Sequence, residues 1–251
     1  MSRTAMILAA GEGTRLKPLT NDTPKALVSL HGIPMLEILV RKLVKAGFEK
    51  IIINVHHFGN QITDFVNSKK GFGAEVIFSR EDILLDTGGG IKKAARFLGK
   101  EPVLFHNVDI LADIDLASYY SDHLEWGGEA SLVIKERPTS RYLLFNNNMY
   151  LSGWYQPEKR IRIISRKSKQ GYYDAAFSGI YILNPSVFED FPDEEVFSLT
   201  PWLLERSGKM DILGWNQGRK YWYDMGTADK LSNTHKKVVV NPDDPYSFIG
   251  V

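Results

Sequence analysis

The sequence contains no cysteine, and this absence excludes several kinds of chemistry at once. Without thiols the chain cannot form disulfide bonds, bind a metal through thiolates or use a cysteine nucleophile. The absence is compatible with a reducing compartment. No apolar run approaches the roughly 18 residues of a transmembrane helix, and the apolar run behind Met1 is too short for a secretory signal. We therefore expect a soluble, cytoplasmic protein with no membrane partner.

An excess of charge of one sign is also missing. Lysine and arginine together number 31 against 30 aspartates and glutamates, which gives a formal net charge of +1. This balance does not produce the basic surface that drives nucleic-acid binding, so we expect no nucleic-acid partner. Any anionic ligand must then be held by local groups. With 251 residues, 43% of them hydrophobic, the chain is long enough for one sizeable core, and we predict a single domain over residues 1–251.

Short apolar runs alternate with segments of helical periodicity along the first half of the chain. This alternation predicts βαβ units around a mostly parallel sheet flanked by helices, which is an α/β fold. The strands that we expect are 5–10, 50–55, 74–78, 102–108 and 130–134. The helices that we expect are 34–47, 61–66, 90–98 and 116–124.

A different pattern occupies residues 137–175. The consecutive asparagines Asn146 to Asn148 stand between apolar runs at 142–145 and 149–154, which predicts a β-hairpin. We interpret this segment as a β-rich insert or lid rather than as a second domain. The α/β pattern then resumes with a strand at 176–183, helices near Pro185 and Leu199, a strand at 221–223 and a final helix from Ala228.

A glycine-rich turn, 11–15, follows the first predicted strand directly. Glycines let a chain turn sharply and bring backbone N–H groups close to phosphate oxygens, although a simple tight turn would use the same residues. The turn matches neither the Gly-x-Gly-x-x-Gly pattern nor the Walker pattern, because Leu16 stands where the former requires its last glycine. Arg15 ends the turn and Lys25 follows Thr23-Pro24, so two cations of different geometry could converge on one polyphosphate.

Two aspartates follow predicted strands. Asp109 directly follows the predicted strand 102–108, and Asp224 directly follows the aromatic run 221–223. Ligands of open α/β sheets bind at the carboxyl ends of strands, so these two carboxylates could share a hard cation such as Mg²⁺ if their strands are neighbours. The alternatives are a helix N-cap for Asp224 and an ordinary turn acid for Asp109.

Taken together, these segments resemble the signature of the sugar-1-phosphate nucleotidyltransferases. The resemblance is carried by 8–16 (Leu-Ala-Ala-Gly-Glu-Gly-Thr-Arg-Leu), by Pro-Leu-Thr at 18–20 and by Thr-Pro-Lys-Ala-Leu at 23–27. It extends over nearly the whole chain, through 32–36, 85–90, 107–109, 177–181 and 224–227.

The resemblance implies a Rossmann-like fold of the GT-A type and Mg²⁺ as cofactor. It also implies roles for individual residues. The catalytic residues would be Arg15, Lys25 and Asp109, and the metal ligands Asp109 and Asp224. The nucleotide-binding residues would be Leu8, Ala10, Gly11, Glu12, Gly13, Thr14, Arg15, Lys25, Thr87 and Gly88, with Thr87 and Gly88 near the base. The sugar-phosphate-binding residues would be Asn107, Ser178 and Gly179.

The reaction that this family catalyses fits the residues present. A sugar-phosphate oxygen attacks the α phosphorus of a nucleoside triphosphate and pyrophosphate leaves, so the protein mainly aligns two anions and neutralises charge. The attacking phosphate is already largely ionised at neutral pH, and neither a protein nucleophile nor a general base is needed. The substrates that we expect are an NTP and a sugar 1-phosphate.

The pattern at 86–90 most resembles N-acetylmuramate 1-phosphate uridylyltransferases, which use UTP. Mannose- or heptose-1-phosphate guanylyltransferases and glucose-1-phosphate thymidylyltransferases are the alternatives, because glycines that leave room for a base do not separate uracil from guanine or thymine. Val108 departs from the Gly or Ala usual at this position of the family.

Two other matters stay open at the level of sequence. A catalytically silent sensor subunit that binds a nucleotide sugar is an alternative of another class, although it would be expected to lose Arg15, Lys25, Asp109 and Asp224 first. We expect no C-terminal hexapeptide-repeat domain. The sequence does not distinguish a monomer from a homo-oligomer.

Overall fold

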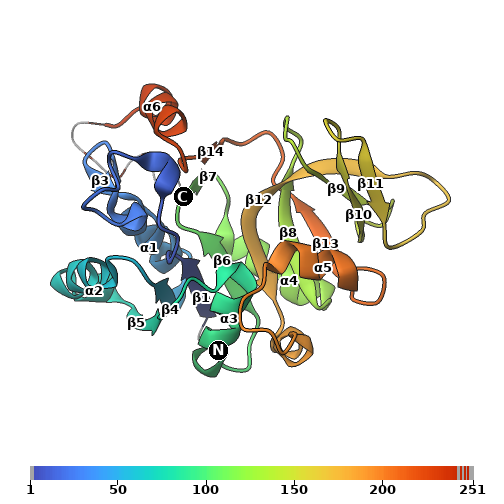
Figure 1. Cartoon of the computed structure of the whole chain (residues 1–251), viewed down its shortest axis with the longest axis horizontal. Coiled ribbons are helices and arrows are strands. Elements are labelled where there is room, and N and C mark those ends of the chain that lie inside the picture. The colour runs from blue at the N-terminus through green and yellow to red at the C-terminus, as the bar shows by residue number, and fades with distance from the viewer. Residues whose placement is uncertain (1–2, 242–243, 245, 247, 249–251) are drawn as a thin grey trace.

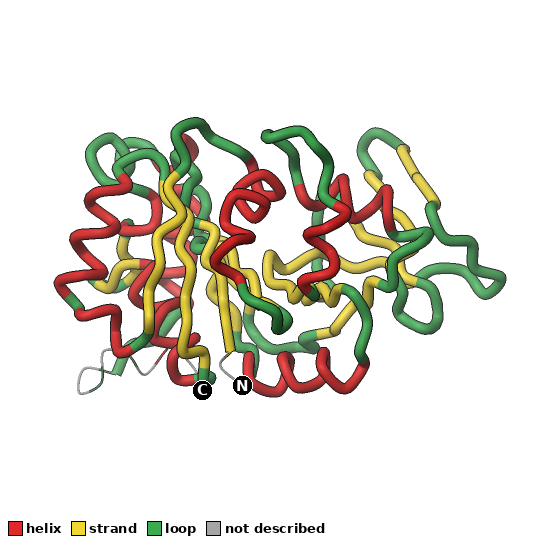
Figure 2. Tube along the Cα trace, turned by 90° about the horizontal axis from the view of Figure 1, so that it is seen from below, coloured by secondary structure: helices red, strands yellow, loops and turns green. Residues whose placement is uncertain are grey.

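The computed structural model describes residues 3–241, 244, 246 and 248, and within them ten strands form one mixed sheet (Figure 1). The strand order is β11-β10-β9-β12-β6-β1-β4-β5, and β8 pairs with β12 and β13 beside this path. Helices lie on both sides of the central strands (Figure 2). The predicted α/β, Rossmann-like fold class is confirmed.

One half of the sheet is parallel and lies close to the prediction. It consists of β1 (Arg3–Leu8), β4 (Phe48–Val55), β5 (Glu75–Arg80) and β6 (Val103–Asn107). Parallel strands covered by helices are buried on both faces, and successive isoleucines of β4, Ile51 to Ile53, have no exposed surface. Because these strands run in the same direction, their carboxyl ends meet at one edge of the sheet.

The other half is largely antiparallel and is joined through β12 (Tyr173–Leu183). This strand pairs antiparallel with β6, β8 (Ala130–Lys135) and β9 (Tyr142–Phe145). The predicted hairpin is confirmed as β9 and β10 (Leu151–Gln156), and β11 (Ile161–Ile164) extends it as an edge strand. Figure 1 shows β9, β10 and β11 at the opposite end of the molecule from α1 and α2.

The sequence did not predict β13 (Ile212–Asn216), which pairs parallel with β8. Its central residue is Gly214, and a glycine inside a short run weakens the strand signal. A Cβ at this position would lie 2.8 Å from the ring of Phe145. The glycine therefore lets an aromatic ring of β9 pack directly on the strand.

The helices cover two separate hydrophobic clusters. Their bounds are α1 (Met35–Lys45), α2 (Gly59–Ser68), α3 (Asp86–Leu98), α4 (Leu116–Trp126), α5 (Leu199–Arg206) and α6 (Ala228–Lys237). Successive residues of a strand face opposite sides, so Ala5 and Ile7 of β1 join the cluster under α1, α2, α4 and α6, whereas Met6 joins the cluster under α3 and α5. In residues 3–241, none of the helices has the length and hydrophobicity that crossing a bilayer requires.

Short elements complete the fold. The helix expected near Pro185 is a 3₁₀ helix, Pro185–Asp190, and three further 3₁₀ helices are Thr14–Leu16, Lys25–Leu27 and Lys70–Gly73. Two small antiparallel ribbons pair β2 (Ser29–Leu30) with β3 (Ile33–Pro34), and β7 (Ile110–Ala112) with β14 (Trp222–Asp224). The second ribbon joins parts of the chain that are far apart in the sequence.

Candidate active site

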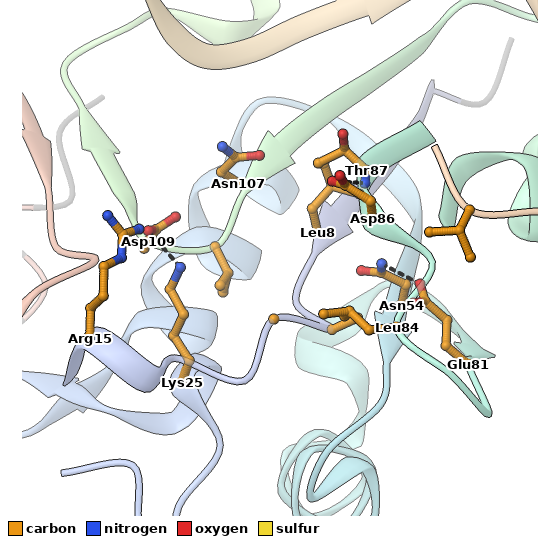
Figure 3. Close-up of a pocket in the computed structure, with 14 residues that line it drawn as sticks. Leu8, Arg15, Lys25, Asn54, Glu81, Leu84, Asp86, Thr87, Asn107 and Asp109 are labelled. Atoms are coloured by element: carbon orange, nitrogen blue, oxygen red, sulfur yellow. Dashed lines mark hydrogen bonds and ion pairs between the residues drawn. The ribbon is translucent and has the colours of Figure 1, made fainter. Parts of the chain in front are cut away.

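A cavity of about 650 Å³ opens at the carboxyl edge of the parallel strands (Figure 3). Leu8 and Asn107 are the last residues of β1 and β6, and Asn54 lies next to the end of β4. Open α/β sheets bind their ligands at this edge. The residues that line the cavity are Leu8, Ala10, Gly11, Arg15, Lys25, Asn54, Glu81, Leu84, Asp86, Thr87, Asn107, Val108, Asp109 and Val196.

The site residues predicted from the sequence fall into two sets. Eight of them line the cavity, namely Leu8, Ala10, Gly11, Arg15, Lys25, Thr87, Asn107 and Asp109. The cavity lining does not include Glu12, Gly13, Thr14, Gly88, Ser178, Gly179 or Asp224. Figure 3 shows that Arg15, Lys25 and Asp109 lie together on one side, while Asn54, Glu81 and Thr87 lie on the other.

The glycine turn is held against Lys25. Gly13 has a φ of +68°, in the left-handed region that favours glycine. A Cβ at Gly13 would lie 2.8 Å from the Lys25 Cβ, so a larger residue would push the lysine away. The Gly13 carbonyl accepts hydrogen bonds from the Thr20 hydroxyl at 2.9 Å and from the Leu16 N–H at 2.8 Å. The turn thus starts the 3₁₀ helix that carries Arg15 and fixes it beside Lys25.

Lys25 and Asp109 form an ion pair on one wall of the cavity. The Lys25 Nζ donates to the Asp109 Oδ2 at 2.6 Å, and their side chains are only 16% and 12% exposed. An ion pair sheltered from water in this way is screened less than a surface pair. Asp109 does lie in the turn that follows β6, but its shelter and its ion pair distinguish it from a solvated turn acid.

The ribbon of β7 and β14 brings Asp224 to Asp109. Asp224 stands opposite Ile110 in the register, and the Met225 N–H donates to the Asp109 carbonyl at 2.8 Å. A Cβ built on Gly226 would lie 2.6 Å from the Asp109 Oδ2 and 2.9 Å from the Asp224 Oδ1. The two carboxylates thus flank one small volume that only a glycine leaves free.

Asp224 does not cap a helix, so this alternative is also wrong. The N-cap of α6 is Thr227, whose hydroxyl accepts from the Lys230 N–H at 3.3 Å. The Asp224 carboxylate instead accepts from the Lys230 Nζ at 2.5 Å and from the Gly226 N–H at 2.8 Å. Burial by itself raises the pKa of Asp224, but these bonds, led by that from Lys230, outweigh burial and hold the pKa below its usual value. Asp224 is therefore a carboxylate at neutral pH.

Two of the three glycines of α3, Gly88 and Gly89, pack against segment 192–198, whereas Gly90 packs behind the cavity residues Asn54 and Glu81. A Cβ at Gly88 would lie 2.2 Å from the Phe197 ring, and one at Gly89 would lie 2.1 Å from the Glu195 carbonyl oxygen. The N–H groups of Gly88 and Gly89 both donate to the Phe197 carbonyl, at 2.9 and 3.2 Å. These two glycines let segment 192–198 pack on the start of α3, and the Phe197 carbonyl satisfies N–H groups of the first turn, which begins at Asp86 and not at Gly90.

Sequence reasoning missed Asn54 and Glu81, which form the other wall. The Asn54 Nδ2 donates to the Glu81 Oε1 at 2.7 Å, and the Asn54 Oδ1 accepts from the Ala9 N–H at 2.7 Å. Burial raises the pKa of Glu81 above its usual value, because the hydrogen bonds from Asn54 and the Leu85 N–H only partly offset it. The position of both residues at the carboxyl ends of β4 and β5 is the same signal that identified Asp109.

The residues expected at the sugar phosphate lie around a distortion of β12. The register of β12 against β8 shifts between Phe177 and Tyr181. Gly179 has a φ of +77°, and a Cβ there would lie 2.9 Å from the Asn107 Nδ2, so glycine permits a close approach to the cavity residue. Ser178 has no exposed surface, and its hydroxyl donates to the Gln217 Oε1 at 3.1 Å. Asn107 therefore faces the cavity, with Gly179 directly behind it.

Comparison with known proteins places the chain among enzymes of one kind. The family model for nucleotidyl transferases matches residues 4–240. The chain is 31% identical over 230 residues to N-acetylmuramate alpha-1-phosphate uridylyltransferase of Neisseria meningitidis, covering 90% of this chain and 94% of that protein. It is 31% identical over 236 residues to the catalytic subunit beta of mannose-1-phosphate guanylyltransferase of Drosophila melanogaster, covering 88% of this chain and 59% of that protein.

Solved structures support the fold. HddC from Yersinia pseudotuberculosis, in its complex with GMP-PN, superposes with a TM-score of 0.73 at 24% identity, covering 94% of this chain and 99% of that one. A putative glucose-1-phosphate thymidylyltransferase from Bacillus anthracis superposes with a TM-score of 0.79 at 20% identity, covering 98% and 99% of the two chains. The match over residues 4–240, together with the relatives of similar sequence, shows that the chain belongs to the nucleotidyl transferase family and is a sugar-1-phosphate nucleotidyltransferase.

Proposed function

We propose that the chain joins UTP and N-acetylmuramate 1-phosphate in this cavity, releasing pyrophosphate. The observation that carries the proposed site is the convergence of Lys25, Asp109 and Asp224 around the glycine turn and Gly226. The choice of UTP and of this sugar rests on relatives in Neisseria meningitidis and in Caulobacter vibrioides, both named N-acetylmuramate alpha-1-phosphate uridylyltransferase; the second is 33% identical over 205 residues, covering 78% of this chain and 81% of that protein.

In this proposal the acceptor phosphate oxygen forms a new bond to the α phosphorus while the bond from that phosphorus to the bridging oxygen breaks. Pyrophosphate carries away the electron pair of the broken bond. Arg15, which ends the glycine turn, pairs with the β and γ phosphates through its planar fork. Lys25 donates to the α phosphate, where its charge stabilises the transition state more than the ground state.

The residues present suit a hard divalent cation. Asp109 and Asp224 offer carboxylate oxygens on two sides of the volume that Gly226 leaves free. Among the described residues no group of three or more His, Cys, Asp or Glu side chains is arranged for a metal, so two carboxylates and substrate phosphates would share the coordination, as Mg²⁺ prefers. When bound, Mg²⁺ would neutralise phosphate charge. We therefore propose Asp109 and Asp224 as its ligands.

The wall formed by Asn54, Glu81 and Thr87 lies across the cavity from Arg15, Lys25 and Asp109 (Figure 3). With the phosphates on the cationic side, the base reaches this wall. The Thr87 hydroxyl already accepts from the Leu199 N–H at 3.0 Å, which fixes its orientation there. Val108 is buried beside Asn107, at the position where the family pattern has a smaller residue. We place the sugar phosphate on the Asn107 side of the cavity.

A pyrophosphate-release assay with UTP, GTP and dTTP against a panel of sugar 1-phosphates tests the proposal. The expected result is the highest kcat/KM for UTP with N-acetylmuramate 1-phosphate. Preference for GTP with mannose 1-phosphate would replace these substrates and would match the relative from Drosophila melanogaster. Nucleotide binding without turnover on any pair would favour a sensor subunit. Chelation of divalent cations by EDTA should abolish turnover, and Mg²⁺ should restore it.

A further inference from the structure

Lys230 is bound to one of the two acids of the site. This residue lies in the first turn of α6, and its Nζ is 2.5 Å from the Asp224 Oδ2. The Lys230 side chain is 50% exposed, whereas that of Asp224 is 22% exposed. The Lys230 backbone N–H donates to the hydroxyl of Thr227, the N-cap of α6, and this bond fixes the position of the Lys230 backbone. Lys230 thus reaches back from a capped helix to an acid that is largely sheltered.

Each acid of the site is matched by one lysine. Lys25 contacts Asp109 at 2.6 Å, and Lys230 contacts Asp224 at 2.5 Å. The two carboxylates flank the same volume at Gly226, where two negative charges without counter-charge would repel one another. The two ammonium groups supply this counter-charge together with the Arg15 guanidinium, whose Nη2 lies 3.6 Å from a Cβ built on Gly226. Lys25 binds the Asp109 oxygen that faces this volume, whereas Lys230 binds Oδ2 of Asp224 and leaves Oδ1 toward it.

The two lysines differ in what else they can do. Lys25 lines the cavity and is 16% exposed, so it stays next to the phosphates after leaving Asp109. Lys230 does not line the cavity, and its only ion pair among the described residues is with Asp224. Its contact with the site therefore runs through this carboxylate.

We infer that Lys230 is a resident counter-ion of Asp224 whose positive charge lowers the affinity of this carboxylate for a divalent cation. The inference rests on the proposed metal role of Asp224. It makes Lys230 a positioning residue: its hydrogen bond holds the Asp224 carboxylate in place in the free protein, and its positive charge beside that carboxylate lowers the affinity of the protein for the cation. Removing the ammonium group should strengthen cation binding and weaken the free fold.

The test measures Mn²⁺ binding to the nucleotide-free protein by calorimetry and by electron paramagnetic resonance. Lys230→Met should bind Mn²⁺ about tenfold more tightly than the unmodified chain, because the positive charge beside the Asp224 carboxylate is gone. Lys230→Arg should resemble the unmodified chain. Lys236→Met is the matched control, since Lys236 is exposed on the same helix and has no carboxylate partner among the described residues. This control should leave the affinity unchanged.

A second readout is thermal unfolding. Without a divalent cation, Lys230→Met should unfold at a lower temperature than the Lys236→Met control, and Mn²⁺ should raise its Tm by more than it raises that of the control. Lys230→Gln, which retains a hydrogen-bond donor, provides a variant should Lys230→Met fail to fold. Equal Mn²⁺ affinity in Lys230→Met, Lys230→Gln and the unmodified chain, or binding by none of them, would overturn the inference.

The failure of the underlying proposal has a different signature. Asp224→Asn should lose Mn²⁺ binding in the presence of a non-hydrolysable UTP analogue. Unchanged binding in that variant would remove Asp224 from the metal site, and the role of Lys230 with it. Lost binding in Asp224→Asn together with unchanged affinity in the Lys230 variants would overturn only the inference about Lys230 and would leave the metal role of Asp224 in place.

Discussion

The strands of the parallel half carry polar side chains at their carboxyl ends. The β-rich segment 137–175 instead places exposed isoleucines on β11, an edge strand of the sheet. Asn54 and Asn107 stand at the ends of parallel strands and line the cavity. In β11 the side chains of Ile161, Ile163 and Ile164 are between 39% and 51% exposed. In the part of the chain that the structure describes, the cavity lining contains no residue of segment 137–175. The cavity therefore lies at the parallel half, and the predictions below test whether the binding chemistry lies there too.

The largest effect on turnover is expected at the Lys25–Asp109 ion pair, at the edge of the parallel half. Lys25→Ala or Asp109→Ala should each lose about 2.7 to 4 kcal/mol of transition-state stabilisation, which is about 10²- to 10³-fold in rate, by analogy with the loss of one oxyanion donor. Steady-state pyrophosphate release measures this loss. Lys93→Ala, which breaks an ion pair with the exposed Asp82, is the control and should keep normal turnover. Near-normal turnover of Lys25→Ala would remove that lysine from the mechanism.

A nearly equal loss of turnover is expected when one methyl group is added at Gly226. Gly226→Ala places a Cβ within 2.9 Å of both Asp109 and Asp224, in the volume that the cation would take. We expect turnover to fall about 10²-fold, comparable to the lower end of what deleting a single electrostatic donor costs. Calorimetric Mn²⁺ binding with nucleotide present should weaken in parallel. Retained binding together with retained activity would show that the carboxylates do not act around this point.

A moderate effect on stability is expected at the start of α3. Gly88→Ala forces its Cβ against the Phe197 ring, and overpacking of this kind costs about 1 to 3 kcal/mol. Chemical denaturation measures the free energy of unfolding. Phe197→Leu removes the ring, so the double variant should be less destabilised than the sum of the two single changes. Additive costs would mean that segment 192–198 does not depend on the glycine.

The smallest effect is expected in the β-rich segment. Ile163→Thr exchanges one exposed β-branched residue for another, and surface changes of this kind stay within about 0.5 kcal/mol. Both the free energy of unfolding and kcat/KM should remain close to those of the unmodified chain. A raised KM for the sugar 1-phosphate alone would show that the segment contacts the acceptor. Binding would then not be confined to the parallel half.

Patterns within short stretches of sequence predicted much of this structure. The apolar runs of β1, β4, β5 and β6 and the acids that follow strands could be recognised locally, since burial and strand ends leave a signal within a few residues. Asn54 and Glu81 also stand at strand ends, but Asn54 lies inside the predicted strand 50–55 and Glu81 lies beyond the predicted end at 78, so neither directly follows a predicted strand as Asp109 does.

Other features depend on partners far away in the chain. Gly88 and Gly89 resemble a ligand-binding turn when read alone, and only the contacts with Glu195 and Phe197 show that they accommodate protein. In the same way, Gly214 weakens the strand pattern of β13, and only the structure shows that the glycine makes room for the ring of Phe145. Long-range contacts of this kind leave no trace in the local pattern.

The β7–β14 ribbon also has a consequence for the order in which this enzyme matures. It joins Asp109 to an acid that the ribosome adds more than a hundred residues later. The strands β1, β4, β5 and β6 all precede β14, so a nascent chain that ends before β14 lacks the second of the two acids. Under the proposed roles of Asp109 and Asp224, such a chain has one of its two cation ligands and should not turn over nucleotide.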